Sequence, residues 1–147
     1  MLAAYTDGAC RVSNPGICSC AWVLYTGNDQ GIFGGEYLGP ELHTNNFAEY
    51  KGLLRLLHYL YEQNILGVTI HCDSALVVNQ VNDVWDVNEQ SLLPLWREAY
   101  GLKNQGNHTL KLVKGHADTP GNNRADELCN ALLDLHKEEY EKLFSKT

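Results

Sequence analysis

One imidazole and one carboxylate lie close together near the carboxyl end of the sequence, on either side of a turn. His116 follows a predicted strand and lies in a loop that contains glycine and proline, and Asp126 lies in the amphipathic segment after it. We expect Asn122 to be the N-cap of a helix there, which would place Asp126 about one turn in. A carboxylate on a helix is held rigidly enough to bind a metal ion, and an imidazole that titrates near neutral pH can move protons. This stretch therefore predicts metal or acid–base chemistry if partner carboxylates lie nearby.

Three more acids stand where they could join Asp126. Asp7 and Asp73 are each predicted to close a strand, and Glu49 lies in the first turns of a predicted helix. If the two strands are parallel neighbours, both aspartates project into the crevice where such sheets bind ligands. Four carboxylates in one crevice would repel unless a divalent cation neutralised them, and oxygen ligands suit Mg²⁺ or Mn²⁺. Any single acid is more simply read as a solvated side chain or a helix cap, but the set of four favours a metal site.

These residues lie in segments that resemble the type 1 ribonuclease H family. The matching segments occur in the family's order and spacing, from about residue 2 to about residue 135: Tyr5 to Cys10, Thr44 to Tyr50, His71 to Ser74, Val113 to His116 and Asn122 to Leu128. The resemblance implies an α/β, ribonuclease H-like fold, in which a mixed five-stranded sheet carries helices on both faces. It also implies an endonuclease that cuts the RNA strand of an RNA–DNA hybrid.

The resemblance gives each acid a role. It implies two Mg²⁺ ions, for which Mn²⁺ can substitute, with Asp7 bridging both, Glu49 and Asp73 on one ion and Asp126 on the other. Metal-activated water would attack phosphorus in line and leave 5′-phosphate and 3′-hydroxyl ends. His116 would relay a proton or ease the departure of the product phosphate.

Substrate contacts are carried over only where the residues match. The resemblance implies that Asn45 and Asn46, together with Asn14, read the minor groove and the RNA 2′-hydroxyls, which distinguish RNA from DNA. Thr44 would donate to a DNA-strand phosphate. The alternative for Thr44 to Asn46 is helix capping. Ala75 stands where the family often has a glutamine that touches the minor groove, so that contact is absent.

The connector from Asp83 to Gln90 departs from many members of the family. Some relatives carry a basic helical protrusion here that holds the hybrid, whereas this connector is acidic or neutral. The chain therefore resembles the compact form of the fold, which lacks the basic protrusion. Trp85 could stack on a sugar or base of the DNA strand, or it could simply anchor the connector.

The elements that must position these residues follow from the hydrophobic periodicity. We expect strands at about 2–7, 18–26, 31–38, 67–72 and 109–114, and helices at about 46–63, 74–82, 91–103 and 122–143. At 147 residues the chain is expected to form a single domain, 1–147, with a core of its own.

The charge of the chain raises an alternative function. The net charge is −7 and the 11 lysines and arginines form no cluster, whereas proteins that grip phosphates usually carry a basic patch. Bound Mg²⁺ would offset part of this deficit. A catalytically weak hybrid-binding module of the same fold remains the alternative. A DNA-cutting nuclease is a third interpretation, but it would not need the Asn45–Asn46 pair.

Cysteine usage and hydropathy bear on the compartment. Five cysteines, an odd number, in a chain with no signal peptide favour reduced thiols, and Cys18 and Cys20 have no second pair at zinc-finger spacing. No apolar run approaches the length of a membrane span. We therefore expect a cytoplasmic monomer that binds RNA–DNA hybrid and no membrane.

Overall fold

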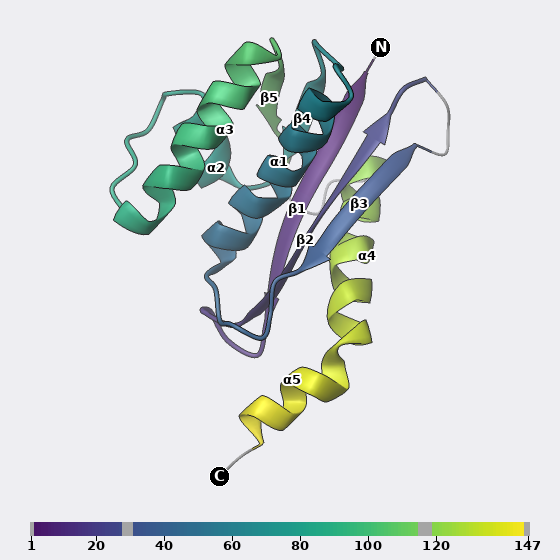
Figure 1. Ribbon diagram of the computed structural model, residues 1–147, viewed down its shortest axis with the longest axis vertical. Helices are drawn as coiled ribbons and strands as arrows, with labels where there is room; N and C mark the ends of the chain where they lie inside the picture. Colours follow the sequence, from purple (N-terminus) through teal and green to yellow (C-terminus); the bar gives the residue numbers. More distant parts are fainter. Residues whose placement is uncertain (1, 28–30, 115–118, 146–147) are drawn as a thin grey trace.

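The computed structural model describes residues 2–27, 31–114 and 119–145, and its centre is a five-stranded mixed sheet (Figure 1). The strands are β1 (Ala3–Arg11), β2 (Ile17–Tyr25), β3 (Ile32–Tyr37), β4 (Thr69–Cys72) and β5 (Thr109–Leu112), in the spatial order β3-β2-β1-β4-β5. The first three strands form an antiparallel meander, and β1, β4 and β5 are parallel. The predicted fold class is therefore confirmed.

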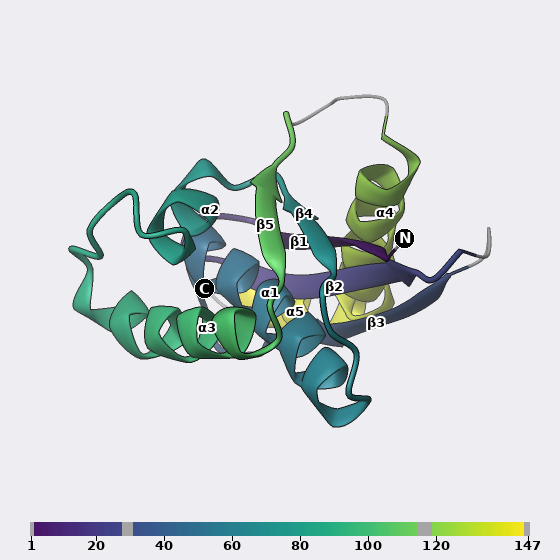
Figure 2. The same ribbon diagram turned by 90° about the horizontal axis from the view of Figure 1, so that it is seen from above.

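Helices cover both faces of this sheet, as Figures 1 and 2 show. They are α1 (Asn45–Glu62), α2 (Ala75–Val81), α3 (Leu93–Gln105), α4 (Pro120–Leu135) and α5 (Lys137–Phe144), and a 3₁₀ turn, Gln90–Leu92, precedes α3. The first three helices pack on one face around a core of leucine, valine and isoleucine side chains, and α4 packs on the other face. Among the described residues, no helix combines the length and the apolar character that a membrane crossing requires.

The strand β1 carries functional groups toward α4 because alternate residues of a strand point to opposite faces. Gly8 approaches the backbone of α1, whereas Asp7 and Arg11 share the other face, next to α4. The prediction that Asp7 closes the strand is wrong, since β1 continues to Arg11. The reason is the partner strand: β4 pairs with β1 only as far as Thr6, but β2 pairs with it up to Arg11.

Two glycines let α1 lie unusually close to β1. A Cβ atom at Gly8 would stand 2.4 Å from the carbonyl carbon of Ala48, and one at Gly52 would stand 2.6 Å from the carbonyl oxygen of Asp7. Neither contact is possible for a real side chain, so both positions require glycine at this spacing. The close approach brings the first turns of α1, with Glu49, to the level of Asp7.

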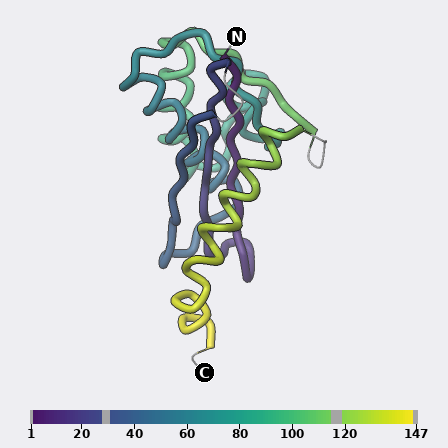
Figure 3. The backbone as a smooth tube through the Cα atoms, turned by 90° about the vertical axis from the view of Figure 1, so that its right-hand side faces the viewer, coloured from purple at the N-terminus to yellow at the C-terminus, as the bar shows by residue number. Residues whose placement is uncertain are grey.

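The last helical region differs from the prediction at both ends. Thr119 is the N-cap residue of α4, and Pro120 takes the first helical position, where its missing N–H costs nothing. The prediction of Asn122 as N-cap is therefore wrong: Asn122 is buried within the first turn. The expected single helix at 122–143 is interrupted at His136, which stacks on Tyr37 of β3, and α5 then continues past the end of the sheet (Figure 3).

The expectation that all cysteines are reduced is also wrong. Cys10 of β1 and Cys18 of β2 form a disulfide in the structure. They are direct partners in the antiparallel register, a relation that appears only once the two strands are paired. Cys20, Cys72 and Cys129 are free and buried, as expected for cysteines that fill the core.

Candidate active site

The structure brings the four predicted acids together from four separate elements. Asp7 lies in the middle of β1, Glu49 in the second turn of α1, Asp73 directly after β4 and Asp126 in the second turn of α4. Asp73 and Asp126 lie close enough to Asp7 for their charges to act on its carboxyl group, and Asp7 and Asp73 act in the same way on that of Glu49. Because β1 and β4 are parallel neighbours, Asp7 and Asp73 also lie close enough to repel each other, as predicted.

Burial and mutual repulsion make this cluster electrostatically unfavourable. Asp7 is 5% exposed and Glu49 is 6% exposed. Desolvation, followed by the charges of Asp73 and Asp126, raises the pKa of Asp7 from its ordinary 3.8 to about 8. Desolvation and the charges of Asp7 and Asp73 raise the pKa of Glu49 well above its ordinary value. Carboxyl groups with such environments are typical of functional sites.

The donor set fits a divalent cation. Among the described residues, the buried Oε1 atom of Glu49 has no hydrogen-bond partner, although unpaired buried oxygens are rare in folded proteins. Ligand atoms of Glu49, Asp73 and Cys72 lie within 4.8 Å of one another. Clustered carboxylate oxygens are the ligands that Mg²⁺ and Mn²⁺ prefer. A bound cation would satisfy the free oxygen and remove the repulsion among the acids.

The thiol of Cys72 was not predicted as part of this cluster. The residue is completely buried, and its side chain belongs to the core beneath α1. The sequence offers only one hint of this, that Cys72 directly precedes Asp73. The hint is weak, because adjacent residues of a strand normally point to opposite faces. Because β4 ends at Cys72, the backbone turns there and both residues approach Glu49.

His116, the predicted proton relay, lies outside the described residues, as do Gly115, Ala117 and Asp118. In the sequence it lies between β5 and α4, the helix that carries Asp126. Its assigned role stays a prediction.

The predicted substrate-binding residues fall into two neighbouring groups. Thr44 is the N-cap residue of α1, and its hydroxyl accepts a hydrogen bond from the Phe47 N–H at 3.1 Å. The exposed Asn14 side chain accepts one from the Asn45 N–H at 2.9 Å, which ties the β1–β2 loop to the same helix end. The capping alternative is therefore correct for Thr44, while the amide groups of Asn14 and Asn45 stand at the surface.

Asn46 and Trp85 form the second group, and they line one open groove. The groove has a volume of about 430 Å³ and lies between the start of α1, the α2 helix and the connector after it. Trp85 is half-buried, with 49% of the residue exposed, which fits both a stacking platform and an anchor for the connector. Gln80, which was not predicted, also lines this groove and accepts a 2.6 Å hydrogen bond from Tyr50.

Comparison with known proteins decides the family. The RNase H family model matches residues 1–133 of the chain. This chain belongs to the RNase H family. The ribonuclease H of Francisella tularensis subsp. novicida (strain U112) is 37% identical over 142 residues, which cover 88% of this chain and 89% of the relative. That of Francisella philomiragia (strain ATCC 25017) is 36% identical over the same coverage.

Solved RNase H structures share the whole architecture. RNase H1 from the halophilic archaeon Halobacterium salinarum NRC-1 has a TM-score of 0.78 at 32% identity, and the match covers 90% of this chain and 97% of that one. LC11-RNase H1, solved in complex with an RNA/DNA hybrid, has a TM-score of 0.79 at 28% identity, covering 91% and 97%. The RNase H domain from Mycobacterium tuberculosis gives 0.81 at 28% identity, covering 94% and 96%.

Membership in the RNase H family confirms the resemblance stated from the sequence. It makes the chain a nuclease, in a family that generally uses divalent metal ions. The acid cluster of Asp7, Glu49, Asp73 and Asp126 is the part of this RNase H that suits such ions.

Proposed function

We propose that the chain is an endoribonuclease that hydrolyses the RNA strand of RNA–DNA hybrids with two Mg²⁺ ions, leaving 5′-phosphate and 3′-hydroxyl ends. Mn²⁺ would substitute for Mg²⁺. The RNase H family match over residues 1–133 supports the substrate class, as does the hybrid complex of LC11-RNase H1. From the sequence, we further propose that the chain acts as a cytoplasmic monomer.

The observation that carries the proposal is the convergence of four carboxyl groups, two of them buried, from four separate elements. Burial and repulsion raise the pKa of both Asp7 and Glu49, and Glu49 Oε1 lacks a partner among the described residues. Such a cluster costs folding free energy unless a cation is bound, because buried like charges repel and buried oxygens need partners. The cluster therefore favours metal binding.

Each acid then has a place in the site. Asp7 interacts electrostatically with each of the other three and would bridge both ions, Glu49 and Asp73 would hold one, and Asp126 would hold the other. When bound, such ions activate a water as the nucleophile and stabilise the charge that develops on the leaving 3′-oxygen. The rigid strand and helix that carry Asp7 and Asp126 would keep the two carboxylates aligned. His116 would move a proton at the leaving group or the product phosphate.

The proposed substrate contacts come from the two groups of neutral side chains described above. Asn14 and Asn45 lie together at the start of α1, and Asn46 faces the groove that contains Trp85. We propose that the amides contact the RNA minor groove and its 2′-hydroxyls, and that Trp85 stacks on the DNA strand. The backbone around Thr44 would then meet a DNA phosphate.

Cleavage of end-labelled duplexes tests the proposal. RNA–DNA, RNA–RNA and DNA–DNA duplexes of one sequence are incubated with the protein in Mg²⁺, in Mn²⁺ and in EDTA. We expect cutting of the RNA strand in the hybrid alone, only with metal, and products that a phosphate-dependent 5′-exonuclease degrades. Cutting of the DNA duplex would favour a DNA nuclease of the same fold, and cutting in EDTA would exclude the metal mechanism.

One observation favours the alternative of a hybrid-binding module with weak turnover. The connector beside the groove exposes Asp83, Asp86 and Glu89, where some relatives place basic residues that hold the hybrid. If the protein bound hybrid but left it intact in Mg²⁺ and Mn²⁺, this alternative would replace the nuclease proposal.

A further inference from the structure

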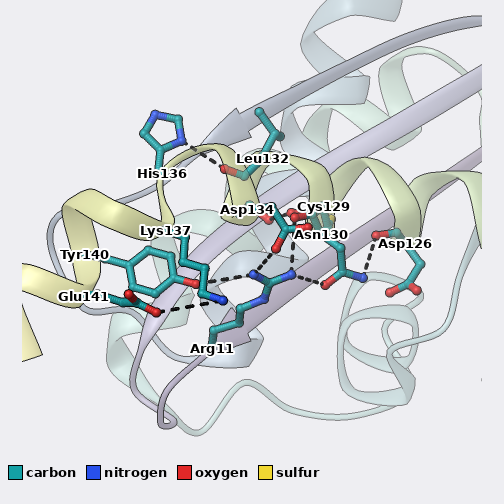
Figure 4. A network of polar contacts seen from close by, with 11 residues as sticks. Arg11, Asp126, Cys129, Asn130, Leu132, Asp134, His136, Lys137, Tyr140 and Glu141 are labelled. Atoms are coloured by element: carbon teal, nitrogen blue, oxygen red, sulfur yellow. Dashed lines mark hydrogen bonds and ion pairs between the residues drawn. The ribbon is translucent and has the colours of Figure 1, made fainter.

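Two side chains of the sheet donate hydrogen bonds to successive backbone carbonyl groups of α4. The buried Ser19 hydroxyl of β2 donates to the Cys129 carbonyl oxygen at 2.8 Å. The Arg11 guanidinium of β1 donates to the Asn130 carbonyl oxygen at 3.3 Å and to the Asn130 side-chain oxygen at 3.0 Å (Figure 4). Both carbonyl groups lie one helical turn after Asp126. The sheet is therefore hydrogen-bonded to the backbone of α4 close to the acid that belongs to the site.

Arg11 is placed for this contact by the register of β1. It lies four residues after Asp7 on the same face of the strand, and its guanidinium also reaches Asp134 and the Tyr140 hydroxyl. The guanidinium therefore joins the strand that carries Asp7 to the helix that carries Asp126. Only 28% of its side chain is exposed, although it bears a charge.

Asn130 extends the contact toward the site. Its side-chain NH₂ donates to the Asp126 carbonyl oxygen at 3.1 Å, while its side-chain oxygen accepts from Arg11. A continuous chain of hydrogen bonds thus runs from Arg11 through Asn130 to the backbone of Asp126, as Figure 4 shows.

The apolar contacts of α4 cannot fix its position along its axis as sharply. The helix meets the sheet through small and medium side chains, Ala125, Cys129 and Leu133, spaced four residues apart along one stripe. Dispersion contacts of this kind are non-directional, whereas hydrogen bonds to named carbonyl groups are satisfied at one position only. A shift of α4 by about 1 Å would move the Asp126 carboxylate relative to Asp7, and misplacement on that scale can cost about 100-fold in rate.

We propose that Arg11 and Ser19 are positioning residues that fix α4 lengthwise on the sheet and thereby set the Asp126 carboxylate against Asp7. Neither side chain touches the reacting atoms. The inference rests on the proposed function in one respect, since it assumes that Asp7 and Asp126 hold metal together.

Four single variants test the inference: Arg11→Met, Ser19→Ala, Arg11→Lys and Arg55→Met. The first two remove one contact each, and Arg11→Lys restores a cation without the fork that reaches several partners. Arg55→Met is the matched control, because Arg55 also joins a helix to a strand, and among the described residues its hydrogen bonds go to the Glu36 side chain, at 2.7 and 3.1 Å, away from the acid cluster. Each variant is measured for Mn²⁺ affinity by calorimetry, for kcat and KM on hybrid, and for Tm.

We expect Arg11→Met and Ser19→Ala each to weaken Mn²⁺ binding about 10-fold and to lower kcat by about 10- to 100-fold, with KM within about two-fold. Arg11→Lys should recover part of both losses, and Arg55→Met should keep parental values. A lower Tm with unchanged Mn²⁺ affinity and kcat, measured well below Tm, would show that Arg11 merely stabilises the fold. If Arg11→Met does not fold, Ser19→Ala decides by the same criteria.

A double-mutant cycle separates positioning from general loosening. In an Asp126→Asn background, Arg11→Met should no longer change Mn²⁺ affinity, because the carboxylate that it positions is gone. An equal loss in both backgrounds would overturn the inference. If the parent protein fails to cut hybrid, the proposed function fails, yet the Mn²⁺ measurements still decide whether Arg11 sets the Asp7–Asp126 pair.

Discussion

At the scale of single residues, Asp7 and Glu49 dominate the energetics of the site. Both are nearly inaccessible to water and both face other carboxyl groups, so the folded chain favours their protonated forms in the absence of a cation. This makes stability and metal binding depend on the same side chains, and it gives the site a thermodynamic signature that can be measured without substrate.

The pH dependence of stability follows from the raised pKa of Asp7. In the unfolded chain this carboxyl group loses its proton near pH 4, whereas in the folded chain it keeps the proton to about pH 8. Stability from this group is therefore full below about pH 4 and is lost as pH rises toward about 8. We expect Tm in EDTA to fall across that range, and added Mg²⁺ to restore it at the alkaline end. A Tm that is flat or rises would contradict a buried Asp7 carboxyl group surrounded by other acids.

Asp7→Asn should separate stability from activity. The change removes one of the repelling carboxylates, so in EDTA at pH 8 we expect Tm to rise by several degrees. The dependence of Tm on pH should become shallower, and the part that remains should come from Glu49. Each 1 kcal/mol corresponds to about 2–4 °C in a chain of this size. Cleavage should be lost, because Asp7 would bridge both ions. Near-normal turnover in this variant would rule out the bridging role.

The His116 side chain is expected to act on rate and not on binding. We predict that His116→Ala slows turnover by about 10- to 100-fold, which reaches only the lower end of the usual effect of positioned proton transfer, while hybrid affinity measured in Ca²⁺ stays the same. A complete loss of activity would contradict the proton-relay role, and so would an unchanged rate.

At the scale of elements, the spacing between α1 and β1 sets the distance between Glu49 and Asp7. Gly52 permits this spacing, since its Cα faces the Asp7 carbonyl oxygen. Gly101 in α3 offers a control, because a Cβ atom there meets nothing within 4 Å. Gly→Ala changes helix propensity in the same way at both positions. A difference between the two variants therefore reports the packing of α1 on β1.

Gly52→Ala should destabilise the protein by about 1–3 kcal/mol, the usual cost of overpacking, and should lower activity, since α1 must move away from Asp7. Gly101→Ala should instead stabilise it by up to about 1 kcal/mol and leave activity unchanged. Urea unfolding and hybrid cleavage measure both effects. Equal changes in the two variants would show that the α1–β1 distance does not limit the site.

The elements that the sequence predicted well are those with a strong period of their own. Leu53, Leu57 and Leu60 made α1 predictable, and Asp73 was placed correctly because a strand pattern ended before it. The wrong predictions depended on partners. Asp7 does not end β1, because β2 pairs beyond it, and Cys10 meets Cys18 through the same pairing.

The residues alone predicted the convergence of the acids on the condition that β1 and β4 are parallel neighbours, and the resemblance supported that topology. Periodicity alone does not state that β1 and β4 are adjacent, and it gave no hint of the contact between Arg11 and Asn130, which are separated by more than a hundred residues. The start of α4 was mispredicted at Asn122 because Thr119 and Asn122 are both capping residue types, and the proline between them was assigned to the preceding loop. Long-range contacts of this kind are decided by packing and not by local propensity.

At the scale of the whole molecule, the acidic chain must still hold a polyanion. With a net charge of −7 and an acidic connector at 83–90, we expect few lysine or arginine contacts to phosphate. Metal ions and neutral donors such as Asn14, Asn45 and Asn46 would supply much of the binding free energy for the hybrid. The hybrid affinity should therefore be modest, and lower still without divalent ions.

Salt dependence tests this balance. Log affinity falls with log salt at a slope of about 0.9 per neutralised phosphate on duplex DNA, so few contacts imply a shallow slope. Replacing residues 83–90 with a lysine-rich segment should tighten binding and steepen the slope, while single-turnover cleavage of bound hybrid stays the same. Affinities are measured in Ca²⁺ or with Asp7→Asn. A slope in the unmodified protein as steep as that of a strongly basic DNA binder would reveal a cationic surface assembled by the fold.

The most direct test of the central claim is single-turnover cleavage of a labelled RNA–DNA hybrid as a function of Mg²⁺ concentration, for the parent protein and for Asp7→Asn. We predict that the parent cuts the RNA strand only when Mg²⁺ is present and leaves 5′-phosphate ends, while Asp7→Asn binds the hybrid in Ca²⁺ without cutting it in Mg²⁺. Cleavage by Asp7→Asn at the parental rate, or an intact hybrid after incubation of the parent in both Mg²⁺ and Mn²⁺, would contradict a metal-dependent ribonuclease built on these four carboxyl groups.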